Sequence, residues 1–235
     1  MAFLTLDKRG LTVSLIMALA LLLLGQGLGI FFVAIMVYFL VLSALVTWAG
    51  KARKKALKLY QRERGVSNVI ANGGCPTIIA AIFFLLSNYL HAPGLELLAV
   101  VGFMGSVAAI MADKFSSELG VLDGMPRLIF TFRKVKRGVS GGVTSLGLAA
   151  GLLGSLLIAV GIFLIWDYIS AVSGYGAYDI LVVFMSIAIA GFSGTVIDSM
   201  LGYYEERGVG NKFTSNFMCS VCGAIISVLL ALAFA

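Results

Sequence analysis

Seven long apolar segments, separated by short polar loops, constrain this chain more than any other feature. A helix needs about 20 mainly apolar residues to cross the hydrocarbon core of a membrane. We therefore predict an all-α fold, a polytopic membrane helix bundle of about seven transmembrane helices forming one integral membrane domain over residues 1–235. The first segment is short, so six spans are the alternative. The predicted spans cover about residues 11–25, 28–49, 74–90, 95–112, 140–166, 178–201 and 214–234.

The composition agrees with a membrane protein. Hydrophobic residues make up 60% of the chain and charged residues only 12%, whereas an average soluble domain carries about 25% charged residues. A net charge of +6 would suggest nucleic-acid binding in a soluble protein. Here the placement of the basic residues explains the charge, so we expect the bilayer as a partner and no nucleic acid.

All 17 lysines and arginines can be placed on one side of the membrane. With seven spans and a cytoplasmic N-terminus, they fall in residues 8–9, 51–64, 114–137 and 207–212. Short cytoplasmic loops accumulate Lys and Arg, so this distribution predicts the orientation. The largest group, in residues 51–64, is typical of a helix lying at the anionic inner leaflet. Its alternative role is to hold substrate phosphates.

The first unusual polar segment on the cytoplasmic side runs from Asn68 to Pro76. Asn72 precedes two glycines, and Pro76 is well placed to begin the third span. A helix N-terminus has free N–H groups and a positive dipole end, which suit an anion. Asn72 is therefore a candidate phosphate-binding residue, and an ordinary capped helix start is the alternative.

Two aspartates lie on small-residue faces of predicted spans. Asp113 follows the glycine-rich face of the fourth span, and Asp198 lies inside the sixth. Small residues let membrane helices approach closely, so both carboxylates are expected to point into the bundle rather than into lipid. Ionisable residues in such positions mark functional sites, because an unpaired carboxylate there is costly. A structural Asp198, hydrogen-bonded across helices, is the alternative.

The fourth and sixth spans also resemble each other, since GFMGSV in residues 102–107 parallels GFSGTV in residues 191–196. Coincidental packing sequence is the alternative. Because both predicted helices run from the outside to the cytoplasm, a true repeat would bring the two carboxylates together at the cytoplasmic end. Paired carboxylates suit Mg²⁺, which commonly bridges to substrate phosphates. The sequence therefore predicts Asp113 and Asp198 as catalytic residues and Mg²⁺ ligands.

A basic, glycine-rich segment, KVKRGVSGGVT in residues 134–144, is predicted to open the fifth span. Glycines expose backbone N–H groups, a helix start favours anions, and Lys or Arg adds positive charge. These features together are typical of a phosphate-binding loop, or phosphate cradle. A basic membrane flank followed by glycine packing is the alternative. The candidate residues here, with Lys134 taken as catalytic, are Lys134, Lys136, Arg137, Gly138, Ser140, Gly141 and Gly142.

The last cytoplasmic loop contains Asn211 and Asn216, which bracket the start of the seventh span. Both can contact a nucleotide or a metal-bound water, or can cap the helix. Cys219 and Cys222 have the spacing of a redox or zinc motif but lie in an apolar helix without a second pair, so packing is the better interpretation. His91 is the only histidine and lies on the outer side, which argues against histidine-based chemistry.

Five stretches of the chain, in this order, resemble the transmembrane protein 19 family, which includes the plant phytyl-phosphate kinases. They are distributed over about residues 68–222, most of the chain, and read ANGGCPT, ADKFSSELG, KVKRGVSGGVTSLGLAAGLLGS, GFSGTVIDSMLGY and NKFTSNF. The resemblance implies a multi-spanning membrane protein. For the plant members it implies conversion of phytyl phosphate to phytyl diphosphate with a nucleoside triphosphate. The acidic block followed by basic-Gly-x-x-Gly is more distantly similar to CTP-dependent polyprenol kinases.

The resemblance also carries functional residues onto this sequence. Through it, Glu118 joins Asp113 and Asp198 as an expected metal ligand. The chain departs from the family at Ala112-Asp-Lys-Phe115, where relatives commonly have Gly-Asp-Thr-Trp. Lys114 either pairs with Asp113 or binds phosphate itself, so substrate choice is open here. The carried-over positions are Asn72, Asp113, Glu118, Lys134, Gly138, Gly141, Gly142, Asp198 and Asn216.

These observations lead to the hypothesis of a membrane-embedded kinase, acting at the cytoplasmic face on an isoprenyl monophosphate with CTP or another nucleoside triphosphate. Phosphoryl transfer depends mainly on positioning and electrostatics, which suits a site without histidine. Two alternatives stay open: CTP-dependent nucleotidyl transfer to a phospholipid, and transport of a lipid or small molecule. A transporter should show polar residues along a path to the outside, whereas the polar groups here cluster on the cytoplasmic side.

Overall fold

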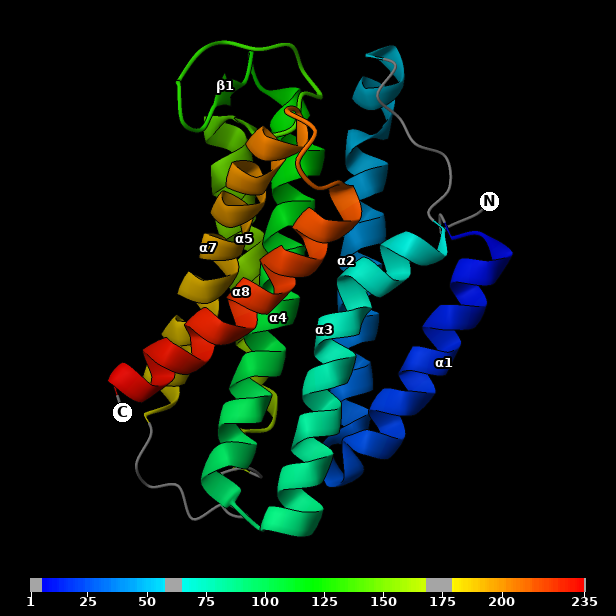
Figure 1. Ribbon diagram of the computed structural model, residues 1–235, viewed down its shortest axis with the longest axis vertical. Helices are drawn as coiled ribbons and strands as arrows, with labels where there is room; N and C mark the ends of the chain where they lie inside the picture. Colours follow the sequence, from blue (N-terminus) through cyan, green and yellow to red (C-terminus); the bar gives the residue numbers. More distant parts are fainter. Residues whose placement is uncertain (1–5, 58–64, 168–178, 235) are drawn as a thin grey trace.

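The structure is a computed structural model that describes residues 6–57, 65–167 and 179–234. These residues form a bundle of long helices (Figure 1), which confirms the predicted all-α polytopic fold. The long helices are α1 (Lys8–Leu24), α2 (Gly29–Ala56), α3 (Val66–Leu85), α4 (Pro93–Leu119), α5 (Ser145–Ala159), α7 (Ile180–Glu205) and α8 (Lys212–Ala233).

Short elements extend or connect these helices. Strands β1 (Arg127–Leu128) and β2 (Gly142–Val143) pair antiparallel. They belong to a connection between α4 and α5, residues 124–144, which we call the hairpin segment. The remaining single turns are η1 (Gln26–Leu28), the π-helical η2 (Leu86–Leu90), η3 (Gly120–Leu122) and η4 (Val160–Leu164).

Six helices in the described part of the chain are long and apolar enough to cross a membrane: α2, α3, α4, α5, α7 and α8, some with their adjoining turns. Helix α1 has 17 residues, which corresponds to about 25 Å at 1.5 Å per residue, somewhat short of a hydrocarbon core of roughly 30 Å. It packs against α2 and α3. A seventh span at α1 therefore stays a prediction.

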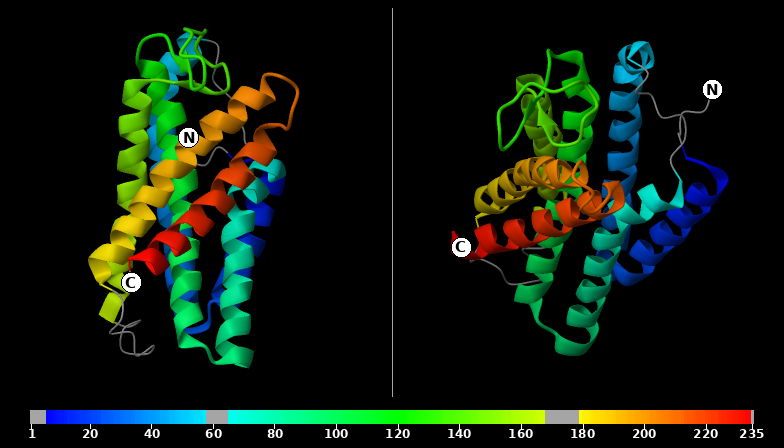
Figure 2. Two further views of the ribbon diagram at one scale, coloured as in Figure 1. Left: turned by 60° about the vertical axis from the view of Figure 1, so that its left-hand side comes forward. Right: turned by 45° about the horizontal axis from the view of Figure 1, so that its top comes forward.

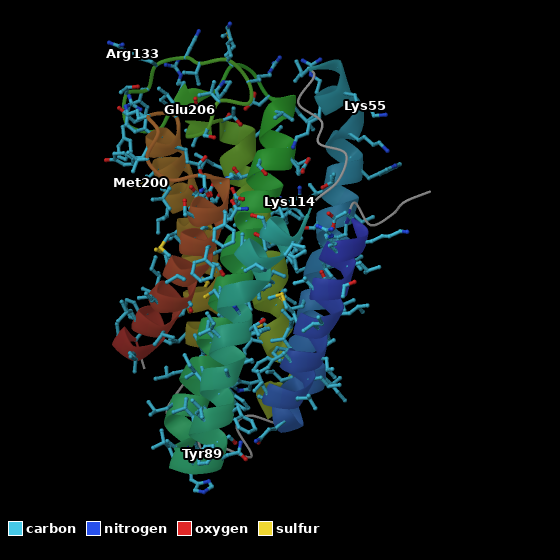
Figure 3. The ribbon with its side chains drawn as sticks, turned by 45° about the vertical axis from the view of Figure 1, so that its right-hand side comes forward. Lys55, Tyr89, Lys114, Arg133, Met200 and Glu206 are labelled. Carbon is cyan, nitrogen blue, oxygen red and sulfur yellow. The ribbon has the colours of Figure 1, made fainter. Side chains whose placement is uncertain are left out.

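Successive helices run in opposite directions, as Figure 1 shows. The start of α1, the end of α2, the hairpin segment and the turn between α7 and α8 consequently lie toward the same end of the bundle (Figure 2). We call this the basic end, because it carries the basic groups of the described residues. The turn after α3, with Tyr89, lies at the opposite end (Figure 3). This arrangement agrees with the predicted sidedness of the loops.

Helix α4 is the central element and packs against α2, α3, α5, α7 and α8. Close contacts form where glycine meets a neighbouring helix. A Cβ atom added at Gly105 would lie 2.6 Å from the carbonyl oxygen of Gly223 on α8. One added at Gly194 of α7 would lie 2.4 Å from the Cβ of Ala109. The predicted small-residue faces of these two spans are thus the surfaces along which the helices meet.

The half of the bundle away from the basic end has an apolar core. Phe32 of α2 stacks on Phe103 of α4 with ring centroids 4.3 Å apart, and meets Phe83 of α3 edge-on at 5.5 Å. The buried hydroxyls of Ser106 and Ser227 donate to backbone carbonyls of their own or a neighbouring helix. The described residues of this half therefore form packed helix contacts rather than a polar path.

The prediction that the third span begins at Pro76 is wrong. Helix α3 already begins at Val66, and Pro76 lies inside it. The polar stretch before Pro76 stays helical because the Asn72 amide donates to the carbonyl of Asn68, one turn earlier. Pro76 lacks an N–H group to continue the ladder, and α3 changes direction about halfway along its length (Figure 1). Asn72 is therefore not at a helix N-terminus.

Two further boundaries differ from the prediction. The fifth span does not start at residue 140, because Thr144 caps α5 by accepting a hydrogen bond from the Gly147 amide, and Ser145 is its first residue. Lys51–Ala56 is not a separate interfacial helix but the last part of α2. The rest of that basic stretch, residues 58–64, lies outside the described residues.

Candidate functional site

A cavity of about 510 Å³ lies at the basic end, between α2, α3, α4, α7, α8 and the hairpin segment. Nitrogen and oxygen atoms gather toward this end of the molecule in Figure 3. Most of the residues singled out from the sequence line the cavity. They are Asn72, Asp113, Lys114, Glu118, Arg137, Gly138, Ser140, Gly141, Gly142, Asp198 and Asn216.

Asp113 and Asp198 are immediate neighbours in this cavity, and we call them the aspartate pair. Asp113 comes from α4 and Asp198 from α7. Ala109 of α4 contacts Gly194 of α7. Asp113 comes four residues after Ala109, and Asp198 comes four residues after Gly194. Because α4 and α7 run in the same direction (Figure 1), one helical turn beyond that contact brings both carboxylates to the same level. The small residues thus position the acids.

Lys212, the first residue of α8, lies beside the aspartate pair. Its ammonium group is 2.9 Å from Oδ2 and 3.1 Å from Oδ1 of Asp198, and it interacts electrostatically with Asp113. Asn216 follows one turn along α8, is buried and lines the same cavity. Its side-chain oxygen has no hydrogen-bond partner among the described residues. An ammonium group therefore lies beside the two acids, and a buried amide oxygen lines the same cavity.

Glu118 forms a second charged group on the α2 side of α4. Its carboxylate lies 2.8 Å from the ammonium of Lys54, also pairs with Lys114, and accepts a hydrogen bond of 3.2 Å from Thr47. Lys114 thus pairs with Glu118, four residues on, and not with Asp113. Within the described residues, no three acidic, histidine or cysteine side chains gather as a metal-binding group. Glu118 interacts electrostatically with Asp113, but its ion pairs are with Lys54 and Lys114.

Several backbone N–H groups of the predicted phosphate cradle are engaged within the protein. The Ser140 amide donates to Glu206 at 2.9 Å, and the Gly142 amide donates to Val139 at 3.3 Å. Gly141 has φ +77° and lies against Gly202 of α7, so closely that a Cβ on Gly202 would be 2.6 Å from the Gly141 nitrogen. The glycines dock the hairpin segment on α7 and are not at the start of α5.

Three predicted residues lie outside the cavity lining. Lys134 and Lys136 are exposed on the hairpin segment. Asn211 caps α8, accepting hydrogen bonds from the Phe213 and Thr214 amides. Helix capping was one of the two interpretations left open for Asn211. The structure therefore gives the two lysines no contact with the aspartate pair.

The hairpin segment is also fastened to the start of α5. Asp123 accepts hydrogen bonds from the amides of Gly124 and Leu146 and from the Ser145 hydroxyl, and these bonds lower the pKa of its carboxyl group. Arg137 donates to the backbone carbonyl of Asp123 at 2.8 and 3.2 Å. Its guanidinium is thereby held at the cavity wall.

Sequence reasoning missed Lys54 and Lys212 as cavity residues. Lys54 lies in the basic stretch that was assigned to the membrane surface. Ser43, Gly50 and Lys54 share one helical face, which the 3.6-residue period would have linked to the buried side of the span. Lys212 precedes Asn216 by four residues, so the same helix face that made Asn216 a candidate includes Lys212.

The fold and the cavity define an integral membrane protein with a charged site at one end of a helix bundle. The chain belongs to the integral membrane protein family DUF92, which matches residues 1–231. This confirms the expected membership in a family of multi-spanning membrane proteins.

Two relatives illustrate the family. An uncharacterized membrane protein of Methanocaldococcus jannaschii is 34% identical over 227 residues, which is 96% of this chain and 85% of the relative. Protein PGR of Arabidopsis thaliana is 34% identical over 181 residues, which is 72% of this chain and 62% of the plant protein. No solved structure matches the chain significantly.

Proposed function

We propose that this chain is a membrane-embedded phosphotransferase that converts an isoprenyl-type monophosphate to the diphosphate, using CTP or another nucleoside triphosphate. The observation that carries the proposal is the aspartate pair inside a cavity that also holds Lys54, Lys114 and Lys212. A buried and a half-buried carboxylate beside ammonium groups, in an apolar bundle, suit two phosphorylated substrates and a divalent cation. The predicted cytoplasmic orientation would put this site where nucleotides are available.

The residues present fit Mg²⁺. This ion prefers oxygen ligands and is commonly bound by one or two carboxylates together with water and substrate phosphates. Asp113 and Asp198 would supply the carboxylates, and the buried Asn216 oxygen, which lacks a partner in the described part of the chain, fits a ligand or a metal-bound water. When bound, Mg²⁺ would neutralise charge on the triphosphate oxygens. Glu118 is not needed in this set.

The proposed reaction needs positioning more than acid–base catalysis. An oxygen of the lipid monophosphate would attack the γ-phosphorus, the bond to the β,γ-bridging oxygen would break, and the nucleoside diphosphate would leave. The acceptor oxygen is already ionised, so no side chain has to remove a proton. Lys212, next to the aspartate pair, would stabilise the charge that develops on the transferred group. Arg137 would offer a further cation at the hairpin wall.

Nucleotidyl transfer to a phospholipid would use the same kind of site and is separated from kinase activity by its product. Release of pyrophosphate indicates nucleotidyl transfer, and release of a nucleoside diphosphate indicates a kinase. Transport is less well supported, because the half of the bundle away from the cavity is packed with Phe32, Phe83 and Phe103 in the described residues.

The test is turnover by the purified full chain in lipid nanodiscs. Geranylgeranyl phosphate or phytyl phosphate is supplied with Mg²⁺ and either CTP or ATP, and products are separated by mass spectrometry. We expect a prenyl diphosphate and a nucleoside diphosphate in equal amounts. No diphosphate with any combination of acceptor and nucleotide would refute the kinase proposal.

Substitutions in the aspartate pair should abolish this turnover. Asp113→Asn and Asp198→Asn each remove a negative charge with little change in volume, and we expect rates to fall by about 100-fold or more. Asp179→Asn is the matched control, because Asp179 caps the start of α7 at the other end of the bundle and Asn caps equally well. A pair variant that keeps wild-type turnover would remove the site from the mechanism.

A further inference from the structure

We propose that Lys54 and Lys114, the lysine pair, bind the monoester phosphate of the lipid acceptor, and that Glu118 is the positioning residue that holds them in place. This inference rests on the proposed kinase function and assigns the acceptor to one wall of the cavity. Glu118 was expected from the family resemblance to bind metal. Its contacts in the structure support a different role.

The geometry places two ammonium groups around one buried carboxylate. Lys54 approaches from α2 at 2.8 Å, Lys114 approaches from the preceding turn of α4, and Glu118 itself is only 3% exposed. The lysine side chains are 16% and 12% exposed. Lysines are seldom this buried unless they are paired. All three residues line the same cavity as the aspartate pair.

The charges on this wall favour an anion. Two ammonium groups and one carboxylate carry a net charge of +1 among themselves, in surroundings where charge is poorly screened. A phosphate monoester brings up to two negative charges and accepts several hydrogen bonds, so it can replace Glu118 as a partner of each ammonium. The Glu118 carboxylate keeps both lysines turned into the cavity before the acceptor arrives.

The aspartate pair and the lysine pair face different parts of the cavity. Asp113 and Lys114 are consecutive on α4, so their side chains diverge by about 100° around the helix axis. Asp113 consequently turns to α7 and α8, where Asp198 and Lys212 lie, whereas Lys114 turns to Lys54 of α2 and Glu118. The acidic wall repels a phosphate unless a cation is present, and the lysine wall attracts it directly.

The apolar residues below the lysine pair point to a lipid rather than a nucleotide. Ile110 lies one turn before Lys114 on α4, and Phe39 lies deeper on α2, and both line the cavity. A prenyl monophosphate matches this order, with a charged head at Lys54 and Lys114 and an apolar chain toward Ile110 and Phe39. A nucleotide would put its polar sugar and base against these side chains.

A binding experiment without nucleotide tests the site directly. Geranylgeranyl phosphate is titrated into the purified full chain in nanodiscs with EDTA present, and geranylgeraniol and CTP are titrated in parallel. We expect the phosphate to bind without divalent cations and about tenfold or more tightly than the alcohol. Lys54→Met and Lys114→Met should each weaken phosphate binding about tenfold and leave alcohol binding unchanged. Absence of phosphate-dependent binding to the wild type would overturn the proposal.

Neighbouring and conservative variants serve as controls. Lys55→Met removes a basic residue beside Lys54 that points away from the bundle (Figure 3), and its binding should equal that of the wild type. Lys54→Arg and Lys114→Arg keep the charge and should recover most of the affinity. Size-exclusion profiles and melting temperatures identify any variant that fails to fold. A Met variant that folds and binds the phosphate as tightly as the wild type would also overturn the proposal.

Kinetics separate acceptor binding from nucleotide and metal binding. In the kinase assay, Lys54→Met and Lys114→Met should raise the KM for the lipid phosphate about tenfold and leave the KM for CTP unchanged. Glu118→Gln should also raise the lipid KM, with no change in the Mg²⁺ concentration that gives half-maximal rate. An effect of the lysine variants on CTP alone, or a tenfold higher Mg²⁺ requirement in Glu118→Gln, would refute the assignment.

The binding and kinetic experiments together distinguish the proposed phosphate site from the kinase function on which it rests. If the lipid phosphate binds as expected but no diphosphate forms with any nucleotide, the kinase proposal fails and the phosphate site stands. If diphosphate forms but the lysine pair has no effect on acceptor binding or acceptor KM, the kinase proposal stands and the inference fails.

Discussion

Lys212 stabilises the aspartate pair, and its ammonium group also takes up space in the cavity beside the carboxylates. Its ammonium group contacts both carboxylate oxygens of Asp198 and offsets the charge of the aspartate pair. In the proposed mechanism, Mg²⁺ binds the same carboxylates that this ammonium group contacts. Binding of Mg²⁺ to the aspartate pair should therefore compete with this ion pair, and Lys212 would then be free to contact phosphate.

We predict that Lys212→Met makes the protein depend on divalent cations for stability. Two neighbouring carboxylates would lose their ammonium partner, which costs 3–5 kcal/mol for a fully buried pair. The Lys212 side chain is 54% exposed, so we expect only about 1–2 kcal/mol after screening by solvent. The melting temperature of the variant in EDTA should fall by a few degrees. Millimolar Mg²⁺ should then raise the melting temperature of the variant more than that of the wild type.

Lys212→Arg is the control for this measurement. It keeps the positive charge next to Asp198, so its melting temperature in EDTA should stay close to that of the wild type. If Lys212→Met melts like the wild type and responds equally to Mg²⁺, the aspartate pair is not a cation site, and the metal assignment is wrong.

At the scale of elements, hydrophobicity and helix period predicted most of the bundle. They located the apolar helices and, through the small-residue faces, the meeting of Asp113 with Asp198. Helix ends were less predictable, because polar residues near an end can remain helical when they bond to their own helix. Asn72 does so through the carbonyl of Asn68, and for that reason the start of α3 was misplaced.

Other contacts between distant segments were not predicted from the sequence. Lys54 reaches Glu118 across 64 positions of the chain, and the hairpin segment meets α7 through Gly141 and Gly202. Neither contact leaves a local pattern, because basic residues next to a span and glycines after a basic run are both common in membrane proteins. The glycines of the predicted phosphate cradle have a packing role that only the tertiary structure reveals.

We predict that Gly202→Ala displaces the hairpin segment and leaves the helices intact. The added Cβ would lie 2.6 Å from the Gly141 nitrogen, a backbone atom that cannot move alone. Overpacking of this kind costs about 1–3 kcal/mol, and here the strain falls on the docking of the segment. Turnover in the proposed kinase reaction should fall about tenfold or more, while trypsin should cut faster after Arg133, Lys134 and Lys136.

Gly124→Ala is the matched control for the hairpin segment. Gly124 lies in the same connection, has no heavy atom within 4 Å of an added Cβ, and is not in the left-handed region of backbone space. Its turnover and tryptic pattern should match those of the wild type. Unchanged cleavage and turnover in Gly202→Ala would show that the close contact with α7 does not hold the segment over the cavity.

Across the whole molecule, charge and polarity are divided between the two ends. The basic loops, the hairpin segment and the cavity lie at one end, and the packed aromatic core lies toward the other. This division assigns the site to one face of the membrane. The start of α1 lies at the same end as the cavity, so we expect both on the same face of the membrane.

The sidedness can be measured with single cysteines and a membrane-impermeant maleimide. Cys75 and Cys219 are buried and Cys222 is partly buried, so replacing Cys222 by Ser should leave a low background. In sealed right-side-out vesicles we expect Tyr89→Cys to react, whereas Lys8→Cys and Lys134→Cys should react only after permeabilisation. We expect this result because short basic loops tend to stay in the cytoplasm, and it would make α1 a seventh span. Reaction of Lys8→Cys together with Tyr89→Cys would contradict the place of α1 in the structure, where its start lies at the basic end. Reaction of Lys134→Cys from outside would invert the whole assignment.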